Sequence, residues 1–375
     1  MDKRQKEIVF VGLSGGVDSA VSAALLKKSG YEVVGVFIKT WHPDFIECNE
    51  EEERHDAMRV AAFLDIPFLT FDFEDVYKKE VADYMIREYK AGRTPNPDVM
   101  CNKEVKFGAF LKKALAMGAD FVATGHYAQN QLRIKNYELK IGVDPSKDQS
   151  YFLWTLKQEQ LSKILFPVGD LKKTEVRQLA KKFKLPVAEK KDSQGICFLG
   201  AVDLKEFLKH YIKEKKGDVV VLSEVEGKKK YEVIGHHPGA VFSTLGERHG
   251  FTITKKGTND ARYYVVAKDI KKNILVVSQK STSNHHPSLL GTPPQKGGEG
   301  EIQIQDTNWI TRTYPLETRT YTCQIRYHGE FLSCKIKYEK NNSAKVIFEK
   351  PVTVAPGQSI VVYDGDICLG GGVVK

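Results

Sequence analysis

A glycine-rich segment near the start of the chain has the residue types needed to bind a phosphate. Residues 12–19 read GLSGGVDS. Glycines let the backbone approach an anion closely, and the amides and hydroxyls of a turn that opens a helix stabilise the anion's charge. The segment is not a Walker A loop, because no Gly-Lys-Ser/Thr follows, and its adjacent glycines exclude G-x-G-x-x-G. Asp18 offers hard oxygen ligands, so we expect it to hold Mg²⁺ on the bound phosphates.

Two further segments contain a cysteine among polar residues. Cys101 lies in NPDVMCNK at 96–103, and Cys197 lies in DSQGICF at 192–198. We expect Cys101 to lie in an extended loop that leads into a helix beginning near Phe107. A thiol close to a helix N-terminus and to lysines is a candidate thiolate, and Asp98 could serve as a general acid or base. The alternative is that each cysteine is a small buried apolar residue.

The elements that must position these residues alternate between strand and helix over residues 6–128. The apolar periodicity predicts strands at 7–13, 31–39, 67–73 and 121–125, and helices at 17–29, 51–64, 74–89 and 107–117. Such alternation implies a parallel sheet covered by helices, with ligands bound beyond the carboxyl ends of its strands.

The rest of the chain changes character twice. Residues 150–216 are predicted to be mostly helical, and β-branched runs dominate from 217 onward. Residues 281–300 are rich in Gly, Pro, Ser and His and are predicted to form a linker. We therefore predict a first domain over 1–216, a central domain over 217–280, a linker over 281–300 and a last domain over 301–375.

The positive charge gathers in the middle of the chain. The net charge is +9, made of −3 over residues 1–146, +11 over 147–300 and +1 over 301–375. This distribution fits a polyanionic partner, nucleic acid first, although lysine-rich helices can also be simply well solvated.

Composition excludes several classes of protein. Hydrophobic residues make up 41% of the chain, which excludes wholesale disorder. No apolar run reaches the ~18 residues of a membrane span, and the start of the chain lacks the features of a signal peptide. Six cysteines without a C-x-x-C pair do not suggest a disulfide scaffold or a zinc ribbon. We expect a cytoplasmic protein with reduced thiols.

The motif Ser-Gly-Gly-x-Asp-Ser resembles the pyrophosphate loop of the N-type ATP pyrophosphatases. The whole chain resembles the tRNA-specific 2-thiouridylase family within that superfamily. The matching blocks are GLSGGVDS (12–19), NPDVMCNKEVKFG (96–108), ATGHYA (123–128), KDQSYFLWTL (147–156), FPVGDLKKTEVR (166–177), KKDSQGICFLG (190–200), YYVVAKDIKKNILVV (263–277), IRY (325–327) and PGQSIVVYDGDICLGGG (356–372). One departure is GERHG at 246–250, where the family usually has Gln in place of Glu247.

The resemblance implies a fold and an activity. The fold would be an α/β Rossmann-like ATP pyrophosphatase domain with a helical extension from about residue 150, then a small central β-rich domain and a C-terminal β-barrel-like domain that contacts tRNA. The activity would be ATP-dependent 2-thiolation of the wobble uridine in tRNA(Lys), tRNA(Glu) and tRNA(Gln). The C2 oxygen would be adenylated with release of pyrophosphate, and sulfur would come from a cysteine persulfide. A cysteine desulfurase or a relay carrier would deliver that sulfur, and the free protein would be monomeric.

The resemblance also assigns residues. Cys197 would carry the persulfide, Cys101 would be the nucleophile, the two would form a transient disulfide, and Asp98 would transfer protons. The residues implied to bind ATP are Gly12, Leu13, Ser14, Gly15, Gly16, Val17, Asp18, Ser19, Ile38 and Gly125. The residues implied to contact tRNA or its target base are Asn96, Pro97, Asp98, His126, Lys147, Asp148, Gln149, Arg326, Tyr327 and Gln358. Without the resemblance, His126 is equally well read as a core histidine and Arg326-Tyr327 as ordinary strand residues.

Two other functions remain open from the sequence. One is another ATP pyrophosphatase that acts on tRNA, such as a lysidine synthetase, although such an enzyme does not need the two loop cysteines. The other is a non-catalytic RNA-binding derivative, although that would predict loss of Asp18, Asp98 or a cysteine, and all are present. Thiolases that carry an iron–sulfur cluster usually have C-x-x-C pairs, which this chain lacks.

Overall fold

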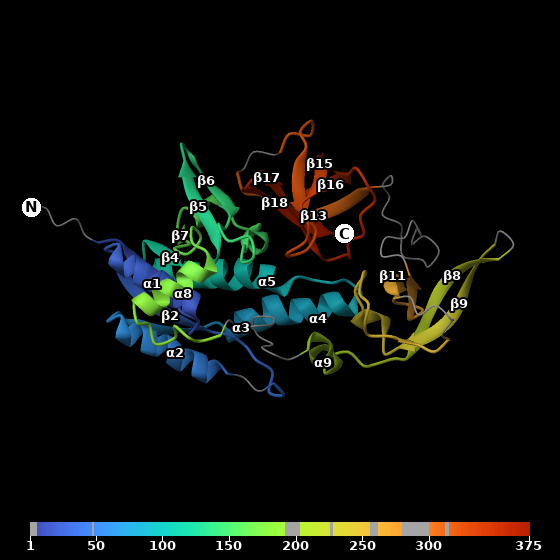
Figure 1. Ribbon diagram of the computed structural model, residues 1–375, viewed down its shortest axis with the longest axis horizontal. Coiled ribbons are helices and arrows are strands. Elements are labelled where there is room, and N and C mark those ends of the chain that lie inside the picture. Colours follow the sequence, from blue (N-terminus) through green and yellow to red (C-terminus); the bar gives the residue numbers. More distant parts are fainter. Residues whose placement is uncertain are drawn as a thin grey trace, which may run out of the picture.

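The structure, a computed structural model, describes residues 6–46, 49–191, 203–225, 228–255, 262–279, 300–311 and 315–375. Figure 1 shows three parts: an N-terminal α/β part in blue and green, a central β-rich part in yellow and a C-terminal barrel in orange and red. This arrangement confirms the fold class predicted from the sequence.

A parallel five-stranded sheet forms the centre of the N-terminal part, with strand order β3-β2-β1-β4-β7. Its strands are β1 (Ile8–Gly12), β2 (Glu32–Lys39), β3 (Phe68–Asp72), β4 (Phe121–Ala123) and β7 (Ile164–Leu165). The strand order reverses between β1 and β4, which pair in parallel. In an open sheet of this kind the crevice at such a reversal is where ligands bind.

Alternating side chains along β1 divide the sheet between two hydrophobic cores. Val9 and Val11 pack in one cluster with α1 (Val17–Lys28), α2 (Glu50–Phe63) and α8 (Lys173–Lys182). Phe10 points to the opposite face and packs in the larger cluster. That second face is covered by two long helical segments, which comprise α3 (Glu74–Tyr77), η1 (Lys78–Ala82), α4 (Asp83–Lys90), α5 (Pro97–Met100), η2 (Cys101–Phe110) and α6 (Leu111–Ala116).

The second of these segments corrects the helix that we predicted over 107–117. It begins at Pro97, ten residues earlier, because the side-chain Oδ1 of Asn96 accepts a hydrogen bond from the amide of Val99 at 3.2 Å. Proline at the first helical position completes this start signal. Cys101 therefore lies inside a helix rather than in a polar loop, and η2 is a stretch of π-helix that begins at this residue.

The region from 128 to 216 contains less helix than expected. It begins with a polar hairpin that the sequence analysis missed, β5 (Ala128–Arg133) and β6 (Asn136–Ile141). The short helices that follow are η3 (Ser150–Leu153), α7 (Gln158–Leu161) and α9 (Leu204–Lys209).

The C-terminal part is a closed barrel of six strands. Its strands are β13 (Glu301–Trp309), β14 (Tyr321–Gln324), β15 (Leu332–Glu339), β16 (Ser343–Phe348), β17 (Ser359–Asp364) and β18 (Ile367–Val374). Pairing of β13 with both β16 and β18 closes the barrel. The hairpin β5–β6 extends its sheet, because β18 also pairs with β6.

The central part is a five-stranded sheet of order β10-β9-β8-β12-β11. Its strands are β8 (Gly217–Val225), β9 (Lys228–His237), β10 (Thr252–Ile253), β11 (Tyr264–Asp269) and β12 (Ile274–Ser278), with the short helix η4 (Ala240–Phe242) between β9 and β10. The predicted linker over 281–300 lies outside the described residues except for Gly300.

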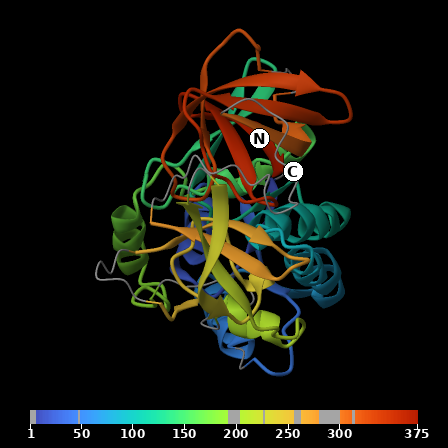
Figure 2. The same cartoon turned by 90° about the vertical axis from the view of Figure 1, so that its right-hand side faces the viewer.

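Buried hydrogen bonds join the barrel to the N-terminal part. Ser359 on β17 accepts from Tyr151 through its backbone oxygen, at 2.9 Å, and from the indole of Trp154 through Oγ, at 3.1 Å. In the view of Figure 2, turned by a quarter from Figure 1, the barrel lies above the N-terminal part and the central part lies in front of it. The larger hydrophobic cluster accordingly contains barrel residues, such as Val361 and Tyr363, together with residues of the N-terminal part. No helix among the described residues is long and apolar enough to span a membrane.

Candidate active site

The segments predicted to bind ATP meet at the reversal of strand order. Residues 12–19 follow β1, Gly125 follows β4, and Ile38 lies near the carboxyl end of β2. These three ends belong to neighbouring parallel strands, so the sheet brings them together at the crevice where nucleotides bind in such folds.

Two glycines let the turn at 12–19, which is predicted to bind phosphate, pack tightly against its neighbours. Gly15 has φ of +72°, and a Cβ there would collide with the backbone oxygen of Glu53 on α2. A Cβ on Gly125 would lie 2.7 Å from the amide nitrogen of Ser19 and 2.8 Å from the carbonyl carbon of Asp18. Gly125 therefore lets β4 approach the first turn of α1, where a helix N-terminus favours an anion.

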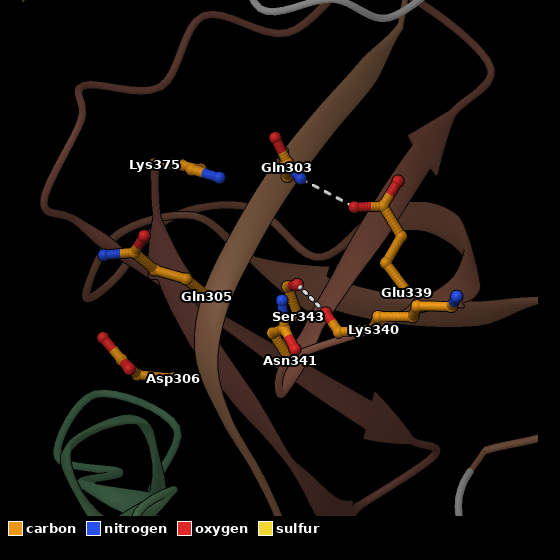
Figure 3. A pocket seen from close by; sticks show the side chains of 8 residues that line it. All are labelled: Gln303, Gln305, Asp306, Glu339, Lys340, Asn341, Ser343 and Lys375. Atoms are coloured by element: carbon orange, nitrogen blue, oxygen red, sulfur yellow. Dashed lines mark hydrogen bonds between the residues drawn. The ribbon is translucent and has the colours of Figure 1, made fainter.

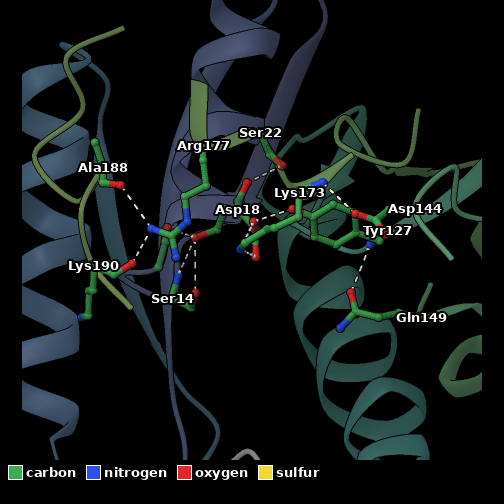
Figure 4. Close-up of polar contacts among 12 residues, drawn as sticks. Ser14, Asp18, Ser22, Tyr127, Asp144, Gln149, Lys173, Arg177, Ala188 and Lys190 are labelled. Carbon is green, nitrogen blue, oxygen red and sulfur yellow. Dashed lines mark hydrogen bonds and ion pairs between the residues drawn. The ribbon is translucent and has the colours of Figure 1, made fainter. Parts of the chain in front are cut away.

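Asp18 is held by two residues that the sequence analysis did not single out (Figure 4). The hydroxyl of Tyr127 donates to Oδ1 of Asp18 at 2.7 Å. The ammonium of Lys173, the first residue of α8, lies 2.7 Å from Oδ1 and 2.8 Å from Oδ2. The side chain of Lys173 is 13% exposed and that of Asp18 is 32% exposed. Tyr127 and Lys173 both lie in sequence blocks that match the family. The sequence signal that separates Lys173 from the exposed Lys172 beside it is that α8 begins at Lys173.

The helix that begins at Pro97 carries the predicted reaction groups. Asp98 and Cys101 are three residues apart on it, so they lie on neighbouring turns of the same face. Asp98 is partly buried, and Cys101 is 2% exposed within the larger hydrophobic cluster. The amide side chain of Asn102 donates to the backbone oxygen of Asp98 at 3.0 Å, which ties the two turns together.

The barrel contributes an aromatic side chain to the same place. The ring of Tyr327 lies 4.3 Å from that of Phe152. Burial first, and then the negative charges of Asp148 and Asp98, raise the pKa of Tyr327 to about 12. The ring of Tyr327 also lies 6.2 Å from that of Tyr151, which hydrogen-bonds with the side chain of Asn96, so a residue from the last domain lies near the start of the helix that contains Asp98.

Three other residues predicted to contact tRNA differ from one another in burial and in hydrogen-bond partners. Asp148 accepts hydrogen bonds from the amides of Gly142 and Ser150, while burial raises its pKa. Gln358 donates to the backbone oxygen of Thr94 at 3.0 Å, and Arg326 is exposed just after β14.

His126 is a buried histidine. Its Nδ1 lies 2.7 Å from the hydroxyl of Thr124, and its ring packs against Phe107 and Phe166. Burial, followed by the charge of Lys106, lowers its pKa well below the ordinary value. The predicted contact of His126 with tRNA stays a prediction, whereas its place in the core fits the alternative reading of the sequence.

Cys197 lies in 192–202, outside the described residues, but the segment that leads to it is described. The ammonium of Lys190 lies 2.7 Å from Oδ2 of Asp56 on α2. Arg177 on α8 donates to the backbone oxygens of Ala188, at 3.1 Å, and Lys190. Since the Cβ of Asp56 lies 3.2 Å from the place of a Cβ on Gly15, Asp56 connects the side chain of Lys190 to the turn at 12–19.

A polar hollow on the outside of the barrel is separate from this site (Figure 3). Gln303 donates to Glu339 there at 2.6 Å, and Lys340 and Lys375 line it with other polar residues. None of the residues predicted to act in catalysis or binding lines this hollow.

The fold and this site define a class: a parallel-sheet nucleotide-binding domain of the ATP pyrophosphatase type, followed by two β domains. Family models match each part, namely the tRNA methyl transferase HUP domain over 7–201, the tRNA methyl transferase PRC-barrel domain over 205–279 and the aminomethyltransferase β-barrel domain over 299–374.

Curated relatives match the chain from end to end. The tRNA-specific 2-thiouridylase MnmA of Geobacillus thermodenitrificans is 44% identical over 98% of this chain and 94% of its own length. The protein of the same name from Nitrosomonas europaea is 42% identical over 98% of both chains. The chain belongs to the tRNA-specific 2-thiouridylase (MnmA) family, a family of tRNA sulfurtransferases.

Solved structures are more distantly similar. The U34-tRNA thiolase NcsA from Methanococcus maripaludis, with its [4Fe-4S] cluster, is 18% identical with a TM-score of 0.35, covering 56% of this chain and 68% of its own. A 4-thiouridine synthetase bound to RNA and ATP is 19% identical with a TM-score of 0.33, covering 54% of this chain and 50% of its own. At such TM-scores neither likeness supports a functional conclusion.

Proposed function

We propose that this protein converts the wobble uridine of tRNA(Lys), tRNA(Glu) and tRNA(Gln) to 2-thiouridine, using ATP and persulfide sulfur. The observation that carries the proposal is that Tyr327 of the barrel lies near the start of the helix that contains Asp98 and Cys101: its ring is 6.2 Å from the ring of Tyr151, and Tyr151 hydrogen-bonds with the side chain of Asn96. An acid–base group and a thiol beside an aromatic side chain suit an unstacked base, and the same domain presents a phosphate-binding turn.

ATP would first activate the base. The C2 oxygen of the uridine attacks the α-phosphorus, a bond forms between them, and the bond from the α-phosphorus to the leaving pyrophosphate breaks. The amides of residues 14–19 and the ammonium of Lys173 would stabilise the phosphate charge, while Asp98 would accept the proton that the uridine ring loses when its C2 oxygen is adenylated. This step turns a poor leaving group, the C2 oxygen, into AMP.

The carboxylate of Asp18 has room for a bond to Mg²⁺. Oδ1 of Asp18 already accepts from Tyr127 and Lys173, whereas Oδ2 accepts from Lys173. Each carboxylate oxygen has two lone pairs, so these contacts leave one on Oδ2 for a cation. Among the described residues no three His, Cys, Asp or Glu side chains gather into a metal site. The phosphates and water molecules would supply the other ligands of Mg²⁺, as is usual for this ion.

Sulfur would then replace the AMP. In one route the Cys101 thiolate attacks the inner sulfur of a Cys197 persulfide, which forms a Cys101–Cys197 disulfide and releases sulfide that attacks C2. In the other, the terminal persulfide sulfur attacks C2 with loss of AMP, and Cys101 then displaces the thiolated base by forming the same disulfide. Either route leaves one disulfide for each product, so a thiol reductant is required for turnover.

Residues of the N-terminal part and of the C-terminal barrel would both contact the tRNA. Asn96, Pro97 and Asp98 would border the flipped base, and Arg326 with Tyr327 would contact the anticodon region by charge and stacking. The basic excess over 147–300 would hold the phosphate backbone, which gives affinity without reading sequence. A cysteine desulfurase or a sulfur carrier would supply the persulfide.

The test is incubation with unmodified tRNA(Lys), ATP, Mg²⁺, a persulfide donor and a thiol reductant, followed by nucleoside analysis. We expect 2-thiouridine from the wild type and none from Cys101→Ser or Cys197→Ser. Cys334→Ala, in the barrel core, is the matched control and should retain activity. Full thiolation by either serine variant would refute the mechanism. Pyrophosphate release without thiolation would favour a different ATP pyrophosphatase, and no ATP turnover would favour a non-catalytic RNA-binding protein.

A further inference from the structure

The segment 144–149 is hydrogen-bonded at both of its ends to the two residues that hold Asp18. At one end, the amide of Gln149 donates to the backbone oxygen of Tyr127 at 2.9 Å, and the amide of Tyr127 donates to Oε1 of Gln149 at 3.0 Å. At the other end, the amide of Lys173 donates to Oδ2 of Asp144 at 2.9 Å. Figure 4 shows these residues around Asp18.

The segment between these ends is itself a tight turn. Oδ1 of Asp144 accepts from the amide of Ser146 at 3.0 Å and from its hydroxyl at 2.7 Å, while the backbone oxygen of Asp144 accepts from the amide of Lys147 at 3.0 Å. The pKa of Asp144 lies below its ordinary value, first because of the hydrogen bond from Lys173 and then because of those from Ser146. The turn is therefore tied together at Asp144, the same residue that accepts from the amide of Lys173.

Both ends lead directly to the phosphate-binding turn. Tyr127 is 2% exposed and its hydroxyl reaches Oδ1 of Asp18, and Lys173 reaches both oxygens of the same carboxylate. The two paths are short: a tyrosine side chain on one side, and the first residue of α8 on the other. Asp18 in turn accepts on its backbone oxygen from the hydroxyl of Ser22, inside α1.

We propose that Tyr127 and Lys173 are positioning residues that connect the tRNA-facing turn 144–149 to Asp18, so that tRNA and ATP bind cooperatively. The inference rests on the proposed function, in which Lys147 to Gln149 face tRNA and Asp18 belongs to the ATP loop. Binding of tRNA fixes the turn, the fixed turn holds Tyr127 and Lys173, and these hold the carboxylate in one orientation before ATP arrives. Linkage requires the reverse effect to be equal, so ATP tightens tRNA binding by the same factor.

The experiment measures that factor. The dissociation constant of α,β-methylene-ATP, which cannot release pyrophosphate, is determined by calorimetry without tRNA and with saturating unmodified tRNA(Lys). We expect tRNA to tighten binding in the wild type by about five-fold or more, the usual range of coupling between sites. Tyr127→Phe removes only the hydroxyl, and Asp144→Ala removes the acceptor of the Lys173 amide. Each should lower the factor, and the double variant should bring it close to one.

The control is Tyr31→Phe, since Tyr31 packs against the same core cluster just beyond the other end of α1. Its factor should equal that of the wild type. A wild-type factor of one, or a double variant that keeps the wild-type factor, would overturn the inference even if its melting temperature falls. A wild type that binds the ATP analogue neither without nor with tRNA would refute the proposed function itself, and the same titrations distinguish this outcome from a factor of one.

Discussion

Substituting Gly125 by alanine should damage the nucleotide site through sterics alone. The added Cβ would lie 2.8 Å from the carbonyl carbon of Asp18 and 2.7 Å from the amide nitrogen of Ser19. Carbon atoms in contact prefer a separation of about 3.5 Å, so β4 and the first turn of α1 must move apart by about 0.7 Å. Both neighbours are backbone atoms, which cannot rotate away as a side chain would.

The size of the effect follows from that displacement. Overpacking of this kind costs about 1–3 kcal/mol, and for a domain of this size each kcal/mol lowers the melting temperature by about 2–4 °C. A shift of nearly 1 Å in a positioning element reduces catalysis by as much as about 100-fold. We therefore expect Gly125→Ala to melt about 2–12 °C lower and to lose most of its kcat/KM for ATP in a pyrophosphate-release assay with tRNA present.

The matched control for folding is Gly12→Ala in the same site. A Cβ on Gly12 would have its nearest neighbours at 3.8 Å, an ordinary contact, so its melting temperature should change less than that of Gly125→Ala. A Gly125→Ala protein with wild-type melting temperature and wild-type pyrophosphate release would show that the close approach of β4 to α1 does not shape the site.

Three further changes test other parts of the molecule. Tyr327→Ala removes the ring beside Phe152, and loss of a base-stacking platform should weaken tRNA binding by about 1–3 kcal/mol in a filter-binding assay; unchanged affinity would exclude Tyr327 from the RNA site. Ser359→Ala leaves the buried indole N–H of Trp154 without its acceptor and should cost about 1–3 kcal/mol of unfolding free energy, measured by denaturant titration, whereas no loss would mean that water replaces the hydroxyl. Burial lowers the pKa of Lys268 to about 8. Between pH 8 and the ordinary lysine pKa, the unfolded chain therefore binds more protons than the folded protein. The free energy of unfolding of the wild type consequently rises with pH in this range. Lys268→Met lacks this gain, so calorimetry from pH 7 to 10 should show the variant becoming less stable relative to the wild type as the pH rises. A difference in unfolding free energy that does not change with pH would contradict the lowered pKa of Lys268.

The sequence predicted the sheet well because its signals are local. The strands β1, β2 and β3 are short apolar runs that are each followed by a helix, and predicted bounds such as 31–39 differ from β2 by one residue at most, whereas the two-residue strand β7 was not predicted. The helix start at Pro97 was predicted wrongly, although Asn96 followed by proline is itself a start signal. The run of residues after it is polar enough to resemble a loop.

Features that depend on distant contacts could not be predicted in this way. The hairpin β5–β6 has a mostly polar sequence and forms because β18, more than 200 residues later, pairs with it. The three adjacent glycines of β18 likewise weakened its strand signal. Lys173 becomes a site residue only because α8 packs on α1 and directs its ammonium to Asp18.

The central claim is that ATP activates the C2 oxygen of one uridine and that sulfur delivered by the two cysteines replaces this oxygen. It is tested most directly by tRNA(Lys) that carries ¹⁸O at C2 of the wobble uridine, incubated with the wild-type protein, ATP, Mg²⁺, a persulfide donor and a reductant. Adenylation of that oxygen predicts that AMP recovered from the reaction carries ¹⁸O in amounts equal to the 2-thiouridine formed, as measured by mass spectrometry. Unlabelled AMP beside newly formed 2-thiouridine would contradict the account.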